Sequence, residues 1–296
     1  MRSAFIDELI RIASDKLNVM LVVGDLGFSV VEPFVARFPR NFINAGVAEQ
    51  NMTGLAAGMA SEGFQVFTYS IANFPTFRCA EQIRNDVDYH RLPVTVVSVG
   101  GGVAYGALGY SHHAVQDYAL LRTFPNMLIA APGDPQEVRA CMRYLAKHPG
   151  PSYLRLGKAG EPTFHAEVPE VMPGRWLKVR DGDASSRRAI ISTGATLGLA
   201  ISWKQSRPEY AAHAVYSMPL WSMASKATQG ACLAQFDEVV TIEDHLLDGG
   251  FGSWFLEARA MCGTDRCAIK PIALNHVVCG TVGSQGALHA LGGLAP

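Results

Sequence analysis

Residues 42–52 read Phe-Ile-Asn-Ala-Gly-Val-Ala-Glu-Gln-Asn-Met. We predict a short strand over Phe42–Asn44 and then a helix over Val47–Ser61. Apolar residues recur at helical spacing on one face of this helix, at Met52, Leu55, Ala56 and Met59. Glu49 points the same way, because it precedes Met52 by three residues. A carboxylate on a buried face is costly unless a group pairs with it. Position alone also allows a solvated Glu49 that favours the positive end of the helix dipole.

Composition limits the class of protein. The 296 residues are 49% hydrophobic and 17% charged, which permits a large core and argues against disorder. The net charge of −1 lacks the positive surface of a nucleic-acid binder. No apolar run reaches the length of a membrane span, so we expect no membrane association. The six cysteines are scattered and form no CxxC pair, and acids stand too early for a secretion signal. We therefore expect a cytoplasmic protein.

Short apolar runs alternate with helical patterns on both sides of the opening stretch. Strands are predicted at Val19–Val23, Gln65–Tyr69, Val94–Val99 and Met127–Ala130. Helices are predicted at the start of the chain and at Phe77–Tyr89, Asp117–Thr123 and Pro135–Lys147. Uniformly apolar strands between helices indicate a parallel sheet that is covered on both faces.

The pattern breaks between residues 157 and 188, where three prolines precede a polar run. The alternation then restarts. Strands are predicted at Ala189–Thr193, Ala212–Ser217 and Glu238–Glu243, and helices at Leu197–Gln205, Ala224–Phe236 and Gly252–Cys262. We therefore predict an α/β fold of two domains with parallel or mixed sheets, residues 1–172 and 173–296.

In such sheets ligands bind at the carboxyl ends of the strands. Those ends carry Asp25, the segment to Glu49, the Phe74 loop and a glycine-rich loop over Gly100–Gln116. The adjacent His112 and His113 cannot point the same way in an extended segment, so they are not a metal-binding pair. No metal ligands are predicted in this chain. The motifs GxxxxGK[ST], GxSxG and HExxH are absent, as is the GDG…Asn pattern that holds a magnesium–diphosphate.

Four segments resemble motifs of one enzyme family. Residues 42–51 are close to R-F-I-[ND]-x-G-I-A-E-Q-[HN], and residues 106–113 resemble G-E-D-G-x-[ST]-H-Q. Residues 126–134 resemble the strand that precedes P-x-D, and residues 241–253 the signature of a third domain. Together they resemble the C-terminal half of thiamine-diphosphate enzymes of the transketolase family, and specifically the C-terminal subunit of a split, two-chain transketolase. The resemblance implies a pyrimidine-binding domain followed by a smaller C-terminal domain. The domain that binds the diphosphate and Mg²⁺ is missing.

The resemblance also implies roles for individual residues. The family glutamate, matched by Glu49, hydrogen-bonds N1′ of the aminopyrimidine and promotes loss of the thiazolium C2 proton. His112 matches a histidine that faces cofactor and substrate. Cofactor contacts are implied for Asp25, Phe74 and Phe77, and substrate contacts for Ser29, His113, Arg155 and Lys158. Ordinary structural roles remain open for these residues: core aromatics, a turn aspartate, and a surface Arg–Lys pair.

Two departures alter the family's donor-recognition set. Gly100 stands where a transketolase histidine is expected, and Leu108 where an acid is expected. We expect transfer of a two-carbon ketol unit between a ketose and an aldose, with phosphorylated or modified sugars as substrates. The expected partners are an N-terminal subunit, which supplies the Mg²⁺ ligands, and a second copy of this chain in an α2β2 assembly. One alternative is a subunit similar to deoxyxylulose-phosphate synthase or one that decarboxylates a 2-oxoacid. Another is a silent scaffold or regulatory subunit, against which the retention of Glu49, Phe74 and His112 argues.

Overall fold

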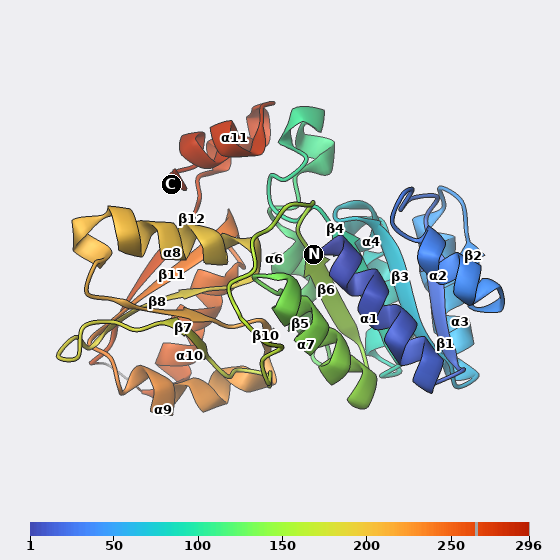
Figure 1. The fold of residues 1–296 in the computed structure, drawn as a ribbon, viewed down its shortest axis with the longest axis horizontal. Coiled ribbons are helices and arrows are strands. Elements are labelled where there is room, and N and C mark those ends of the chain that lie inside the picture. Colours follow the sequence, from blue (N-terminus) through green and yellow to red (C-terminus); the bar gives the residue numbers. More distant parts are fainter. Residues whose placement is uncertain (264–265, 296) are drawn as a thin grey trace.

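Two β-sheets lie side by side in the computed structural model, which describes residues 1–263 and 266–295 (Figure 1). The first sheet has seven strands in the order β10-β5-β6-β4-β3-β1-β2. Its strands are β1 (Val19–Val23), β2 (Phe42–Asn44), β3 (Gln65–Ile71), β4 (Val94–Val99), β5 (Leu128–Ala130), β6 (Ser152–Leu156) and β10 (Leu220–Ser222). All neighbours pair in parallel except β10, which is antiparallel to β5.

Helices cover both faces of this sheet, as the apolar strands predict. Alternate residues of β1 enter different cores. Leu21 and its β1 neighbours two residues away pack with helices α1 (Arg2–Asp15) and α7 (Pro135–Lys147). Met20 and Val22 pack on the other face with α3 (Glu49–Ser61). A strand buried on both faces has no position for a polar side chain, which explains the unbroken run VMLVV.

The second sheet has five strands in the order β12-β11-β8-β9-β7. They are β7 (Leu177–Arg180), β8 (Arg188–Ser192), β9 (Ala214–Ser217), β11 (Glu238–Leu246) and β12 (Ala268–Leu274). Only the β7–β9 pair is antiparallel. The helices of this half are α8 (Leu197–Ser206), α9 (Gln229–Leu233), α10 (Phe251–Cys262) and α11 (Gln285–Leu291). The predicted α/β class with parallel and mixed sheets is confirmed.

Some predicted elements were wrong or missed. The helix expected over 77–89 is divided into α4 (Phe74–Phe77), α5 (Ala80–Gln82) and a π-helical turn over Ile83–Asp88. The helix expected over 224–236 is a 3₁₀ turn, Ala224–Thr228, followed by the short α9. Strands β6, β7, β10 and β12 were not predicted, and β7 lies inside the presumed linker. The domain limits 1–172 and 173–296 stay a prediction, although β10 crosses over from the second half to complete the first sheet.

In the described part of the chain, no helix has both the length and the apolar character needed to cross a membrane.

Candidate active site

Glu49 is the first residue of α3, directly beyond the end of β2. Its side chain is only 3% exposed, and its Oε2 accepts a hydrogen bond from Arg78 Nη1 at 3.0 Å. Met52 and Ala56 are buried on the same helix, as predicted, whereas Leu55 is 37% exposed and lies off the buried face. The solvated interpretation of Glu49 is therefore wrong, and the acid is both buried and paired.

Three further side chains continue from Glu49 in a line. The Arg78 guanidinium carbon lies 4.3 Å from the centroid of the Phe74 ring. Phe74 in turn meets the His112 ring edge-to-face, with centroids 5.1 Å apart. A hollow of about 410 Å³ opens at the Glu49 end, lined by residues 47–51 and Arg78. An acid, an aromatic face and an imidazole thus border one open site.

The position of His112 is set by its loop. Asn73 Nδ2 donates to the backbone oxygens of Ser111 at 3.3 Å and of His113 at 2.8 Å, which ties the loop to the start of α4. Burial, together with the neighbouring His113 and Arg78, lowers the pKa of His112. The neutral imidazole is therefore favoured near pH 7, so the ring can accept a proton.

Comparison with known proteins identifies the fold and the family. The family model described as "Transketolase, pyrimidine binding domain" matches residues 1–160. The chain belongs to the transketolase family. The family and the half of the enzyme expected from the sequence motifs are thereby confirmed.

The similar proteins agree with one another. One of the two subunits of an apulose-4-phosphate transketolase from Phocaeicola vulgatus is 32% identical over 259 residues, which span 86% of this chain and 82% of that protein. A putative transketolase C-terminal section of Methanocaldococcus jannaschii is 31% identical over 94% of this chain and 87% of its own length. The solved structure of a split-gene transketolase, an inactive β4 tetramer, superposes with a TM-score of 0.84 at 27% identity and covers 99% of this chain and 93% of its own.

A longer relative belongs to another branch of the transketolase family. The 1-deoxy-D-xylulose-5-phosphate synthase of Pelotomaculum thermopropionicum is 30% identical over 86% of this chain, but this chain spans only 40% of that enzyme.

Asp25 lies beside the site, and Ser29 follows it on the same exposed loop. Asn44 holds Asp25 in place, because its Nδ2 donates to Asp25 Oδ1 at 2.9 Å and its Oδ1 accepts from the Asp25 backbone N–H at 3.1 Å. Both Asp25 and Ser29 have a positive φ, 56° and 62°. Phe77 is 46% exposed and lines a different hollow with Tyr110 and Gln116. Phe74, rather than Phe77, faces the line that begins at Glu49.

Two expected substrate ligands are engaged elsewhere. Arg155 is 3% exposed, and its guanidinium donates to Asp117 Oδ2 at 2.7 Å and to Asp244 Oδ1 at 2.6 Å. His113 is fully buried, with Nε2 3.4 Å from the Gly106 carbonyl oxygen. Neither presents a free donor at the surface. Lys158 is exposed, with Nζ 5.3 Å from the centroid of the Tyr105 ring, and can reach an anion.

Sequence reasoning missed Arg78. It stands four residues after Phe74, one helical turn on, so its spacing could have signalled a shared face.

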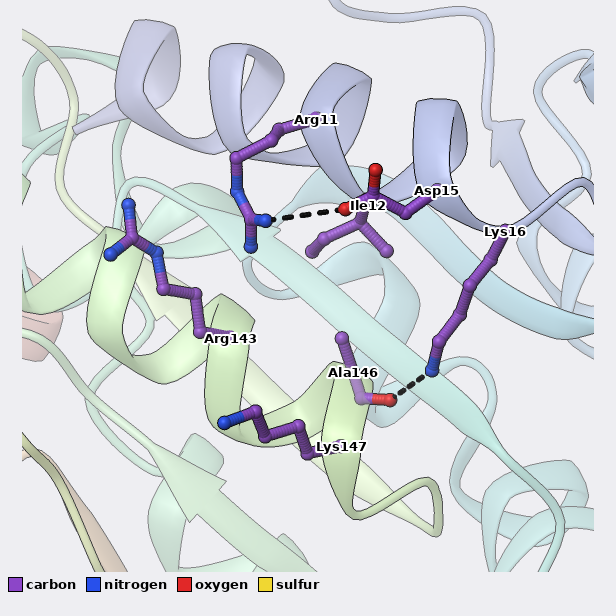
Figure 2. Close-up of a pocket in the computed structure, with 7 residues that line it drawn as sticks. All are labelled: Arg11, Ile12, Asp15, Lys16, Arg143, Ala146 and Lys147. Atoms are coloured by element: carbon purple, nitrogen blue, oxygen red, sulfur yellow. Dashed lines mark hydrogen bonds and ion pairs between the residues drawn. The ribbon is translucent and has the colours of Figure 1, made fainter.

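A second hollow, of about 480 Å³, lies between α1 and α7 (Figure 2). Arg11, Lys16, Arg143 and Lys147 surround it. Both helices end here, at Asp15 and Lys147. Cations are stabilised at helix C-termini, where the dipole is negative, so this charge is explained without a ligand.

Proposed function

We propose that this chain is the C-terminal subunit of a thiamine-diphosphate-dependent transketolase. In this proposal it transfers a two-carbon ketol unit from a ketose to an aldose once it has combined with an N-terminal subunit. The observation that carries the proposal is the buried Glu49, set at the mouth of a hollow with Phe74 and His112 beyond it.

The donor set fits the pyrimidine end of thiamine diphosphate. A carboxylate that is 3% exposed can hold a proton against a ring nitrogen, because little water competes for it. The half-buried Phe74 ring offers a flat face to an aromatic ligand. In the Glu49 hollow no residue resembles a diphosphate cradle. Among residues 1–263 and 266–295, no group of three His, Cys, Asp or Glu side chains could hold a metal ion. We therefore assign the diphosphate and Mg²⁺ ligands to the partner subunit.

The cofactor, when bound, supplies a carbon nucleophile that attacks the ketose carbonyl. The residues of this chain manage protons and orientation around it. Glu49 holds the proton at the pyrimidine N1′. For this, Arg78 has to leave its contact with Glu49 and with the Phe74 face, and its 51% exposure leaves it free to turn toward solvent. His112, with its lowered pKa, moves a proton at the substrate oxygen. Asp25 and Lys158 remain proposed contacts to cofactor and substrate phosphate, and Ser29 a weaker one.

The rim of the site favours a covering partner. Val47, Phe77, Leu108 and Tyr110 are apolar side chains between 46% and 74% exposed. Exposed apolar residues gathered near a site are typical of an interface. The similar split-gene chain forms an inactive β4 tetramer, which supports self-association of this chain and a need for the second subunit. The cytoplasm is the proposed location, because all six cysteines are free.

The test is reconstitution. The chain is mixed with the product of a neighbouring reading frame that carries GDG…Asn, and Mg²⁺ and thiamine diphosphate are added. We expect transfer of a ketol unit from a phosphorylated ketose to an aldehyde. Release of CO₂ from a 2-oxoacid would instead favour a function like that of the synthase relative. If the complex forms but neither reaction occurs, the chain is a scaffold and the proposal fails.

A further inference from the structure

The loop of residues 100–116, which carries His112, belongs to the first half of the chain but is held by the second half. Figure 1 shows the 3₁₀ turns at Gly106–Leu108 and Tyr110–His112 standing next to α11, away from the rest of the first sheet. Two separate contacts make this connection, one at the base of the loop and one near its tip.

At the base, Arg155 joins the loop to β11. Its Nη1 donates to Asp244 Oδ1 at 2.6 Å, and its Nη2 donates to the Ala114 carbonyl oxygen at 2.7 Å. Ala114 and Gly102 close the base with two backbone hydrogen bonds of 2.8 and 3.0 Å. Asp244 is 2% exposed, so this connection is shielded from water. Buried, charge-assisted hydrogen bonds of this kind are strong and directional.

The glycines at the base are explained by the same contact. A Cβ on Gly101 would lie 2.5 Å from Arg155 Nε, and one on Gly102 would lie 2.1 Å from Asp244 Oδ2. Gly102 also has a φ of +66°, which disfavours other residues. The loop backbone therefore passes against the Arg155–Asp244 pair with no room for a side chain.

At the tip, the C-terminal segment makes the second contact. The Gly283 N–H donates to the Gly106 carbonyl oxygen at 3.2 Å. A Cβ on Gly106 would lie 2.3 Å from Cδ1 of Leu288, which belongs to α11. His112 thus stands on a loop whose base and tip are both fixed by the second domain.

We propose that Asp244 is a positioning residue, which acts through Arg155 and the loop base to hold His112 in the site. This rests on the proposed function only in giving His112 a role there. Asp117 also accepts from Arg155, so the guanidinium keeps a counter-charge when Asp244 is replaced. Replacement of Asp244 therefore leaves no unpaired buried charge, and the chain is expected to fold.

The first experiment needs no activity. Hydrogen–deuterium exchange is measured on the full chain and on the Asp244→Ala variant. We expect exchange over residues 102–114 to become about ten-fold faster, as a local loss of roughly 1.4 kcal/mol produces. The matched control is Glu257→Ala, because Glu257 on α10 pairs at 2.7 Å with Arg122, across the same two domains but outside the loop.

Unchanged exchange over residues 102–114 in Asp244→Ala overturns the proposal. Equal loosening of that segment by Glu257→Ala also overturns it, since the effect would then belong to the domain contact in general. If Asp244→Ala does not fold, Asp244→Asn is measured in its place. It preserves the shape but not the charge, and a rise confined to the same segment is required of it as well.

The second experiment separates positioning from mere structure. In the reconstituted complex, Asp244→Ala is expected to lower kcat by about ten- to a hundred-fold, because misplacement of a reacting group is costly. In a His112→Gln background the same change should cost less than about two-fold, since the group it positions is gone. Full additivity of the two losses overturns the proposal. An inactive wild-type complex would count against the proposed function, while the exchange experiment would still decide the role of Asp244.

Discussion

Replacement of Glu49 by glutamine is the sharpest test of the site, because it separates folding from chemistry. An amide has nearly the shape of a carboxylate, so the packing above Met52 and beside Gly24 is kept; Gly24 has room for a Cβ 3.6 Å from Glu49 Cγ. The ion pair lost is with Arg78, which is 51% exposed and can be rehydrated by solvent. We therefore expect a change in the free energy of unfolding of about 0–1 kcal/mol, the range of pairs open to water.

The expected effect on activity is far larger. Glutamine cannot share a proton with N1′, and removal of a positioned acid or base typically costs about 10²–10⁴-fold in rate. The assay is deuterium exchange at C2 of the cofactor in the reconstituted complex, followed together with ketol transfer. Exchange as fast as in the wild type would remove Glu49 from the proposed mechanism.

Glu8→Gln is the matched control. Glu8 is also buried, at 2% exposure, and also accepts from arginine, with Arg143 Nε at 2.9 Å, but it lies on α1. It makes the same chemical change at another buried Glu–Arg pair. Activity should stay near the wild-type value. Equal losses in the two variants would mean that a disturbed fold, rather than lost proton transfer, explains the result.

Three further outcomes are expected. The purified chain alone should show no turnover and bind thiamine diphosphate weakly, as calorimetry can measure; turnover without a partner would end the two-subunit proposal. Sedimentation of the mixed chains should show an α2β2 heterotetramer, which a fully active one-to-one heterodimer would contradict. Burial lowers the pKa of His245 from 6.5 to about 4 against the opposing charge of Asp117, so the fold holds the neutral ring and stability is lost as pH falls from 6.5 toward 4. Denaturant unfolding should show about 2 kcal/mol less stability at pH 5 than at pH 7 from this group, and His245→Asn should reduce that difference.

The sequence predicted best where local pattern and tertiary burial agree. The strands Val19–Val23 and Val94–Val99 have the predicted bounds, because both faces of each are buried and every residue is constrained. The buried face of α3 was predicted at Met52 and Ala56, but it is narrower than the apolar pattern, so Leu55 is exposed. The class of fold followed from the alternation of such strands with helices.

Polar residues with distant partners were the main source of error. Strand β6 is fully buried yet contains Ser152 and Arg155, so it shows no apolar run. Ser152 is satisfied by Thr95 Oγ1 at 2.8 Å on β4, and Arg155 by acids at 117 and 244. No local pattern contains those partners. The same fact made Arg155 resemble a phosphate ligand, because an arginine in a ligand-binding family has two uses that only its surroundings distinguish.

Strand β10 has a consequence for synthesis of the chain. Residues 220–222 complete the edge of the first sheet against β5, residues 128–130. Until residue 222 has left the ribosome, β5 therefore has a free edge, and such edges recruit other strands. A fragment that stops at residue 172 would keep this edge permanently. We expect that fragment to aggregate, whereas one extended past residue 222 closes the sheet. The last strand of the pyrimidine-binding half is thus delivered late, by a segment that lies beyond the limit at which that half was predicted to end.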